Sequence, residues 1–186
     1  MKKQPEITAL TKQKLIDAFW TLYEENRIDQ IRVKEITYIA NLHRGTFYEY
    51  FTDIYDLLAQ EEAEILKQLK EGMTLRLQEK DEIDGLKNIA EFYLKNGRRM
   101  NILISSGGDS GFLKQFTKAL YPLFRSVNSR TDTEESSIIY AFGINGLLMA
   151  FHEWYEHQDR MPIDDFLILL RSLIEKGIPS TIKNVR

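Results

Sequence analysis

The chain has 186 residues and no cysteine, and its 25 lysine and arginine residues face 28 aspartate and glutamate residues, for a formal net charge of −3. Without cysteine the chain cannot have disulfides, thiolate metal sites or cysteine catalysis. No apolar run approaches the roughly 20 residues of a membrane helix, and no apolar segment follows the charged start, so we expect a cytoplasmic protein without a membrane segment.

Helical periodicity dominates the chain, and no stretch sustains the alternation of a half-buried strand. We therefore predict an all-α fold. The first helix is expected over about residues 10–26, with Leu15, Phe19, Leu22 and Tyr23 on its buried side.

A second, short helix is predicted at residues 33–40, with Val33, Ile36, Ile39 and Ala40 as its apolar face. Asn41 follows, and asparagine enters the left-handed backbone region at modest cost. We therefore expect the helix to end in a tight turn at this residue, as a helix-turn-helix requires.

A third helix is predicted from Arg44 to Phe51, with Phe47 and Phe51 facing inward at i, i+4. Its outward side chains suit a DNA groove, because phosphate contacts position such a helix and base contacts give it specificity. Arg44 and Thr46 are expected to reach base edges, His43 either bases or phosphates, and the remaining four candidates phosphates: Arg32, Lys34, Tyr48 and Tyr50. The alternative is that these are ordinary solvated surface residues.

These segments resemble the N-terminal pattern of the TetR family of one-component transcriptional regulators. The matches lie in the first third of the chain: Ala18, Leu22, Val33, Ile36, Ala40, the run Gly45-Thr-Phe-Tyr-Glu-Tyr-Phe51, Asp53, Leu57 and Leu58. The resemblance implies an N-terminal three-helix helix-turn-helix domain, here residues 1–57, and a C-terminal helical bundle domain for ligand sensing and dimerisation, here residues 58–186. It also implies double-stranded operator DNA as a partner.

The chain departs from the family pattern at several positions. Asn41 stands where glycine is usual, and Arg32 and His43 stand where serine or threonine often caps a helix, so both caps should be weaker. Thr52 and Ile54 occupy positions where lysines are frequent, and residues 1–57 contain eight basic and nine acidic residues. Since DNA-binding surfaces are normally basic, a lower intrinsic DNA affinity follows as a hypothesis.

The rest of the chain is predicted to be helical. Asp53 should cap a helix that reaches about residue 80 and ends in the charged stretch 79–82. Further helices are expected at 83–105, interrupted near Gly97, and at 112–127, 133–157 and 164–176. Residues 105–111 and 128–132 are predicted to be connecting segments.

The last two predicted helices are apolar almost all round, so each must be covered on two sides. One cover can be the chain's own core and the other a second subunit. The resemblance implies a homodimer held by a four-helix bundle of these C-terminal helices. A helix at the centre of a monomer's core is the alternative.

Aromatic side chains in the C-terminal part can line an apolar effector pocket, as the resemblance implies for many family members. Four are the better candidates for ligand binding because each has a polar group to orient a guest: Tyr93, Tyr121, Tyr140 and Trp154. The sequence does not name the effector, and we expect no cofactor.

Two enzyme-like patterns fail on geometry. His152 and His157 are five residues apart, about 140° around a helix, so they cannot chelate one metal ion as an i, i+4 pair can. The Gly108-Asp-Ser-Gly111 run resembles a serine-protease motif but lacks strands to hold a catalytic triad. We expect no catalytic site, no metal site and no enzymatic activity.

The sequence thus favours a homodimeric, sequence-specific DNA-binding regulator, with a ligand-responsive repressor as the commoner form in the family. The alternative is a TetR-like protein with weak DNA affinity that works as a ligand-sensing or protein-binding partner of another regulator.

Overall fold

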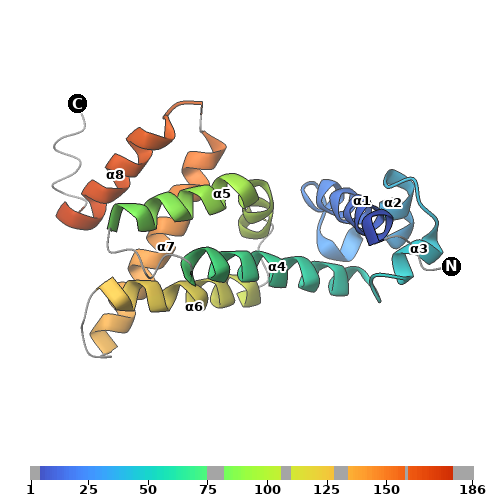
Figure 1. Cartoon of the computed structure of the whole chain (residues 1–186), viewed down its shortest axis with the longest axis horizontal. Coiled ribbons are helices and arrows are strands. Elements are labelled where there is room, and N and C mark those ends of the chain that lie inside the picture. The colour runs from blue at the N-terminus through green and yellow to red at the C-terminus, as the bar shows by residue number, and fades with distance from the viewer. Residues whose placement is uncertain (1–4, 75–81, 106–109, 128–133, 158, 178–186) are drawn as a thin grey trace. The chain divides into compact units, whose positions relative to one another are not determined.

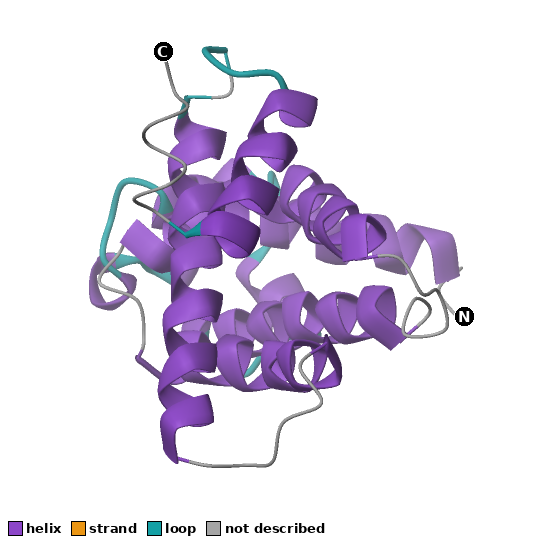
Figure 2. Cartoon of the chain, turned by 90° about the vertical axis from the view of Figure 1, so that its left-hand side faces the viewer, coloured by secondary structure: helices purple, strands orange, loops and turns teal. Residues whose placement is uncertain are grey.

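The computed structural model describes residues 5–74, 82–105, 110–127, 134–157 and 159–177. These residues form eight α-helices and one short 3-10 helix, with no strand among them (Figures 1 and 2). The elements in chain order are α1 (Pro5–Tyr23), η1 (Ile28–Gln30), α2 (Val33–Ile39), α3 (Arg44–Tyr48), α4 (Ile54–Thr74), α5 (Glu82–Ser105), α6 (Ser110–Val127), α7 (Glu134–Glu156) and α8 (Ile163–Lys176). The predicted all-α fold is confirmed.

The chain divides into two compact units. The first comprises Met1–Ile65 and Ile102–Gly108, and the second comprises Leu66–Asn101 and Asp109–Arg186. The helix α4 therefore contributes its first half to one unit and its second half to the other. The predicted functional division after residue 57 falls near the start of the same helix.

The first unit is built around α1, which packs against α2, and α2 packs against α3. Its core includes the fully buried side chains of Leu15, Phe19, Ile36, Phe47 and Leu57. The side chain of Trp20 is also buried, and its indole N–H donates to Oε2 of the buried Glu61 over 2.9 Å. This bond joins α1 to α4. It gives the indole N–H and the carboxylate a hydrogen-bond partner each, and either group would be costly to bury without one.

The apolar face predicted for α2 is partly wrong. Ile36 and Ala40 are buried, but Ile39 is 47% exposed, and Thr37 takes an inward position. The reason is the position of Ile39 around the helix axis. A residue six positions after Val33 lies about 240° away from it and therefore on another face. The Thr37 hydroxyl can be buried because it donates to the carbonyl of Val33 over 3.0 Å.

In the second unit, α5 continues without a break through Gly97, where an interruption was predicted. A Cβ atom at Gly97 would overlap the ring of Tyr155 on α7. The glycine therefore permits close packing of two helices and does not end one. Three predicted features lie wholly or mainly outside the described residues: the break at 79–82, the connection at 105–111 and the linker at 128–132.

The helices α7 and α8 each have a buried and an exposed side. On α7, Tyr140, Ile144 and Phe151 are buried, whereas on α8 Phe166 and Leu170 are buried. The rings of Phe151 and Phe166 meet edge to face with their centroids 5.0 Å apart. The exposed sides carry further large apolar residues: Ile138, Ile139, Phe142, Met149, Ile168 and Ile174.

Candidate nucleic-acid interface

The turn between α2 and α3 is made by Asn41, which has a φ of 53° and is the only non-glycine residue with positive φ among those described. The N–H of Asn41 donates to the carbonyl of Tyr38, and that of Leu42 donates to the carbonyl of Thr37. These two bonds form a Schellman motif, the usual left-handed ending of a helix. The predicted left-handed turn at Asn41 is confirmed.

The helix α3 begins at Arg44, after an N-cap residue, His43, whose side chain makes no capping hydrogen bond. It ends at Tyr48 and not at Phe51 as predicted, although the N–H of Phe51 still donates to the carbonyl of Phe47 over 3.0 Å. Phe47 and Phe51 are both buried, as expected, and their ring centroids are 5.4 Å apart. The inner side of α3 is therefore fixed by aromatic packing.

On the outer side of α3, Arg44 and Tyr48 form a pair. The Nη2 atom of Arg44 donates to the Tyr48 hydroxyl over 3.0 Å, and the guanidinium lies 5.6 Å from the centre of the same ring. Both side chains are exposed, and Thr46 beside them is half-buried. Because a guanidinium has five N–H donors, most of Arg44 stays available to an outside partner while Tyr48 limits its motion.

The candidates around α2 differ in how far they are already engaged. The guanidinium of Arg32 donates to the carbonyls of Asp29 and Ile31 over 2.6 and 3.1 Å. The backbone N–H of Arg32 donates to Glu35, which supplies the cap that the arginine side chain cannot. Lys34 and His43 are exposed. Arg32 is thus held against its own turn, whereas Lys34 extends into solvent.

Tyr50 is half-buried, and its hydroxyl donates to the carbonyl of Thr8 on α1 over 3.2 Å. The structure therefore gives this hydroxyl a role within the unit, in competition with the predicted phosphate contact.

Tyr38, which the sequence analysis did not single out, is 86% exposed on α2. An aromatic residue on the polar face of a short helix was the signal that could have identified it.

The start of α4 is fixed by hydrogen bonds to two carboxylates. Asp53 caps the helix as predicted, since its Oδ1 accepts the N–H of Asp56 over 2.8 Å. Oδ2 of Asp56 in turn accepts the N–H of Thr52 over 2.8 Å. The Thr52 N–H, followed by the side-chain amide of Gln60, holds the pKa of the Asp56 carboxyl below its ordinary value. Thr52 and Asp53 are thereby fixed to the first turn of α4.

The four residues predicted to bind a ligand have different surroundings. The Tyr93 hydroxyl is buried and donates to Oδ1 of Asn101 over 2.9 Å, and burial together with the charge of Glu156 raises the pKa of Tyr93. The Trp154 indole N–H donates to the carbonyl of Met161. Tyr121 alone among the four lines a groove between α6 and α7.

That groove has a volume of about 610 Å³ and is lined by Leu113, Lys114, Thr117, Lys118, Tyr121 and Asn145. The sequence analysis did not identify Lys114, Thr117, Lys118 or Asn145. Their signal is weak in the sequence, because a groove between two helices depends on how the helices pack.

The imidazole of His152 takes part in a hydrogen-bond network. The Nδ1 atom of His152 lies 2.9 Å from Oδ1 of Asn101, in the same buried network as Tyr93. Within the described part of the chain no three acidic or histidine side chains are grouped as metal ligands. Among the described helices, none has the length and apolar character of a membrane span.

No protein-family model and no curated protein matches the sequence. Solved structures do match it. A TetR transcriptional regulator from Streptococcus agalactiae shares 22% identity over 92% of this chain and 97% of its own, with a TM-score of 0.66. The fatty acid degradation regulator FadR from Bacillus halodurans shares 15% identity over 96% of this chain and 98% of its own, with a TM-score of 0.62.

A third match is the transcriptional regulator FadR from Bacillus subtilis in complex with stearoyl-CoA. It shares 19% identity over 89% of this chain and 98% of its own, with a TM-score of 0.65. Each likeness extends over both units, well beyond the first third in which the sequence resemblance lies. The chain therefore has the TetR-like, all-helical fold that its N-terminal motif predicts.

Proposed function

We propose that this protein is a sequence-specific DNA-binding transcriptional regulator that acts as a homodimer, with α3 as its recognition helix. The observation that carries the proposal is the division of α3 into two sides. Phe47 is buried in the core, whereas Arg44 and Tyr48 are joined to each other on the outside. A short helix fixed from within and polar outside is what major-groove reading requires.

The homodimer is supported by the exposed apolar side chains of α7. Ile138, Phe142 and Met149 recur at i, i+4 and i+11, and Phe142 is 72% exposed. Burying each such side chain contributes about 1.5–3 kcal/mol, so a self-complementary contact across this face would stabilise a dimer. We expect Phe142→Glu to yield monomers in analytical ultracentrifugation. Leu94→Glu is the matched control, because Leu94 is an exposed apolar residue on α5.

The proposed mechanism is control of the distance between two recognition helices. Competent binding to adjacent major grooves needs a separation of about 34–36 Å. A small-molecule effector that binds better to a dimer with another separation lowers DNA affinity, and by linkage DNA lowers the affinity for that effector by the same factor. We propose repression as the sign of regulation, no enzymatic activity, and the cytoplasm as the place where the protein meets DNA.

The test is fluorescence anisotropy with labelled genomic fragments that flank the protein's own gene, at two salt concentrations. A specific complex at near-physiological salt is expected. If no fragment forms such a complex at either concentration, the assignment of α3 as a recognition helix fails.

A second candidate is a TetR-like protein that binds DNA weakly and acts on another regulator. It is favoured by the near balance of charge in residues 1–57 and by the engagement of Arg32 and Tyr50 within their own unit. The same titration separates the two candidates, because only the first predicts a specific complex with the wild-type protein.

A further inference from the structure

We infer that the groove between α6 and α7 is a binding site for a small organic anion with an apolar body. This inference rests on the proposed function only for its regulatory meaning, since such a ligand would be the effector. Binding itself can be measured without DNA. The groove lies entirely within the second unit.

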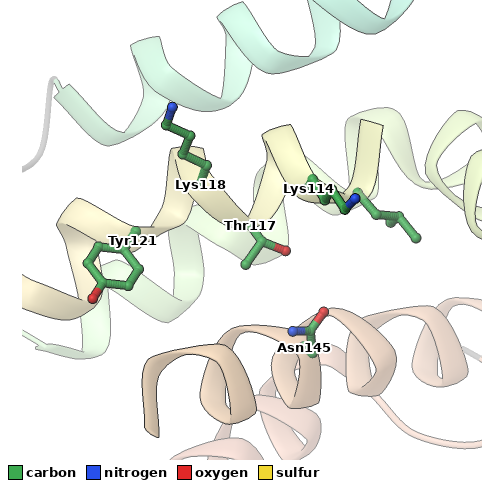
Figure 3. A pocket seen from close by; sticks show the side chains of 6 residues that line it. Lys114, Thr117, Lys118, Tyr121 and Asn145 are labelled. Carbon is green, nitrogen blue, oxygen red and sulfur yellow. The ribbon is translucent and has the colours of Figure 1, made fainter. Parts of the chain in front are cut away.

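The size of the groove fits a small molecule. Its volume of about 610 Å³ lies within the range of about 300–1,000 Å³ that small-molecule sites occupy. Figure 3 shows Thr117 and Tyr121 on the side of α6 that faces Asn145 of α7. In the same view the Lys118 side chain points away from Asn145, to the opposite side of α6, although the residue belongs to the lining. Its long, flexible stem allows the ammonium group to turn toward a bound anion.

The side chains that line the groove carry positive charge and hydrogen-bond donors but no negative charge. Two of the six lining side chains are cationic, three others can donate hydrogen bonds, and none is acidic. The sequence of α6 contains no aspartate or glutamate at all, although acidic residues outnumber basic ones in the whole chain. Neither Lys114 nor Lys118 has an ion pair within the described residues. An anion is the class of group that satisfies this arrangement.

The aromatic wall supplies the apolar contact. The ring of Tyr121 lies 5.1 Å from the buried ring of Tyr140, edge to face, and Leu113 lines the groove nearby. The Tyr140 hydroxyl is buried and has no hydrogen-bond partner among the described residues. A buried hydroxyl without a partner among the described residues is costly in a closed core, and it belongs to a ring that touches the Tyr121 wall of the groove.

The test uses two fluorescent probes that share one aromatic framework. The first, 8-anilinonaphthalene-1-sulfonate, carries a negative charge, and the second, N-phenyl-1-naphthylamine, carries none. The variant Lys114→Gln/Lys118→Gln should weaken binding of the sulfonate about 3- to 20-fold, because each exposed ion pair contributes modestly. Binding of the neutral probe should stay the same.

The matched control is Lys87→Gln/Lys95→Gln, which removes the same charge from two exposed lysines of α5. This control should leave sulfonate binding unchanged. An equal loss in both double variants would mean that only net charge matters, and no loss in the groove variant would place the probe elsewhere. Either result overturns the inference, whether or not the protein binds DNA.

Displacement of the bound sulfonate then defines the ligand class. Decanoate should displace it, whereas decan-1-ol and inorganic phosphate at the same concentration should not. Equal displacement by decan-1-ol would show that binding does not depend on the negative charge of the ligand. Equal displacement by phosphate would show that binding does not depend on an apolar body.

Discussion

The pairing of Arg44 with Tyr48 makes a prediction that a double-mutant cycle can test. Both side chains lie on the exposed side of α3, and the tyrosine hydroxyl accepts a hydrogen bond from the guanidinium over 3.0 Å. If Arg44 reads a base and Tyr48 holds it in place, Arg44→Ala and Tyr48→Phe should not weaken operator binding independently. The double variant should then resemble Arg44→Ala alone.

The magnitudes follow from the contacts. Loss of an arginine–base contact costs about 1–3 kcal/mol per half-site, hence about 2–6 kcal/mol for a symmetric dimer. Since 1.4 kcal/mol is a factor of ten, Arg44→Ala should weaken binding at least about 25-fold and relax sequence preference. Tyr48→Phe removes one hydrogen bond, for which about 0.5–1.5 kcal/mol per subunit is typical, so its effect should be smaller.

Fluorescence anisotropy with specific and scrambled duplexes is the assay, and thermal unfolding is the check on folding. Neither variant should change the melting temperature appreciably, because both side chains are exposed and their truncation leaves no cavity. Arg27→Ala is the control, since Arg27 is an exposed cation of the same unit that pairs with Asp29. Unchanged binding curves for both α3 variants would refute the recognition-helix assignment. Additive losses would give Tyr48 a phosphate contact of its own.

Three further variants probe other parts of the molecule. Phe47→Ala should destabilise the first unit by about 3–5 kcal/mol. Proteases should then cut the N-terminal part faster while the protein stays dimeric, and a thermal melt like that of the wild type would contradict the burial of Phe47. Thr52→Lys/Ile54→Lys should tighten DNA binding and steepen the salt dependence by up to about 3.6 units per dimer, and an unchanged slope would mean that neither position meets a phosphate. Gly97→Ala should lower the melting temperature, because the added Cβ atom overlaps the Tyr155 ring.

The local chemistry of the turn could be predicted from the sequence because few residues accept a left-handed backbone. Asn41 follows an amphipathic segment, and its φ of 53° is what that position demands. The inward positions of Phe47 and Phe51 also follow from spacing alone, since i, i+4 residues share a helix face. These predictions needed no knowledge of distant segments.

The predictions that failed depended on tertiary packing. Gly97 suggests a helix break when read locally, but α5 continues through it, and the missing Cβ atom leaves space for the ring of Tyr155 on α7. The rings of Tyr93, Tyr140 and Trp154 are buried by the same kind of packing, and their role in ligand binding stays a prediction. Composition identifies residues able to bind a guest, and only the packing of helices decides which of them reach a groove.

A count of charged residues also ignores tertiary contacts when it is used to judge DNA affinity. It gives every cation equal weight, whereas Lys12 donates to Gln60 over 2.9 Å and lies over the Phe51 ring. The guanidinium of Arg32 is likewise held by backbone carbonyls. Among the predicted phosphate contacts, Lys34 is then the cation that remains exposed to solvent without a described partner. One such cation per subunit neutralises about two phosphates per dimer, so the wild-type protein should show a shallow salt dependence, with a slope of about −1.8. With so small an electrostatic contribution, specific binding would depend mainly on base contacts made by α3, and a variant without Arg44 would retain little preference for any sequence.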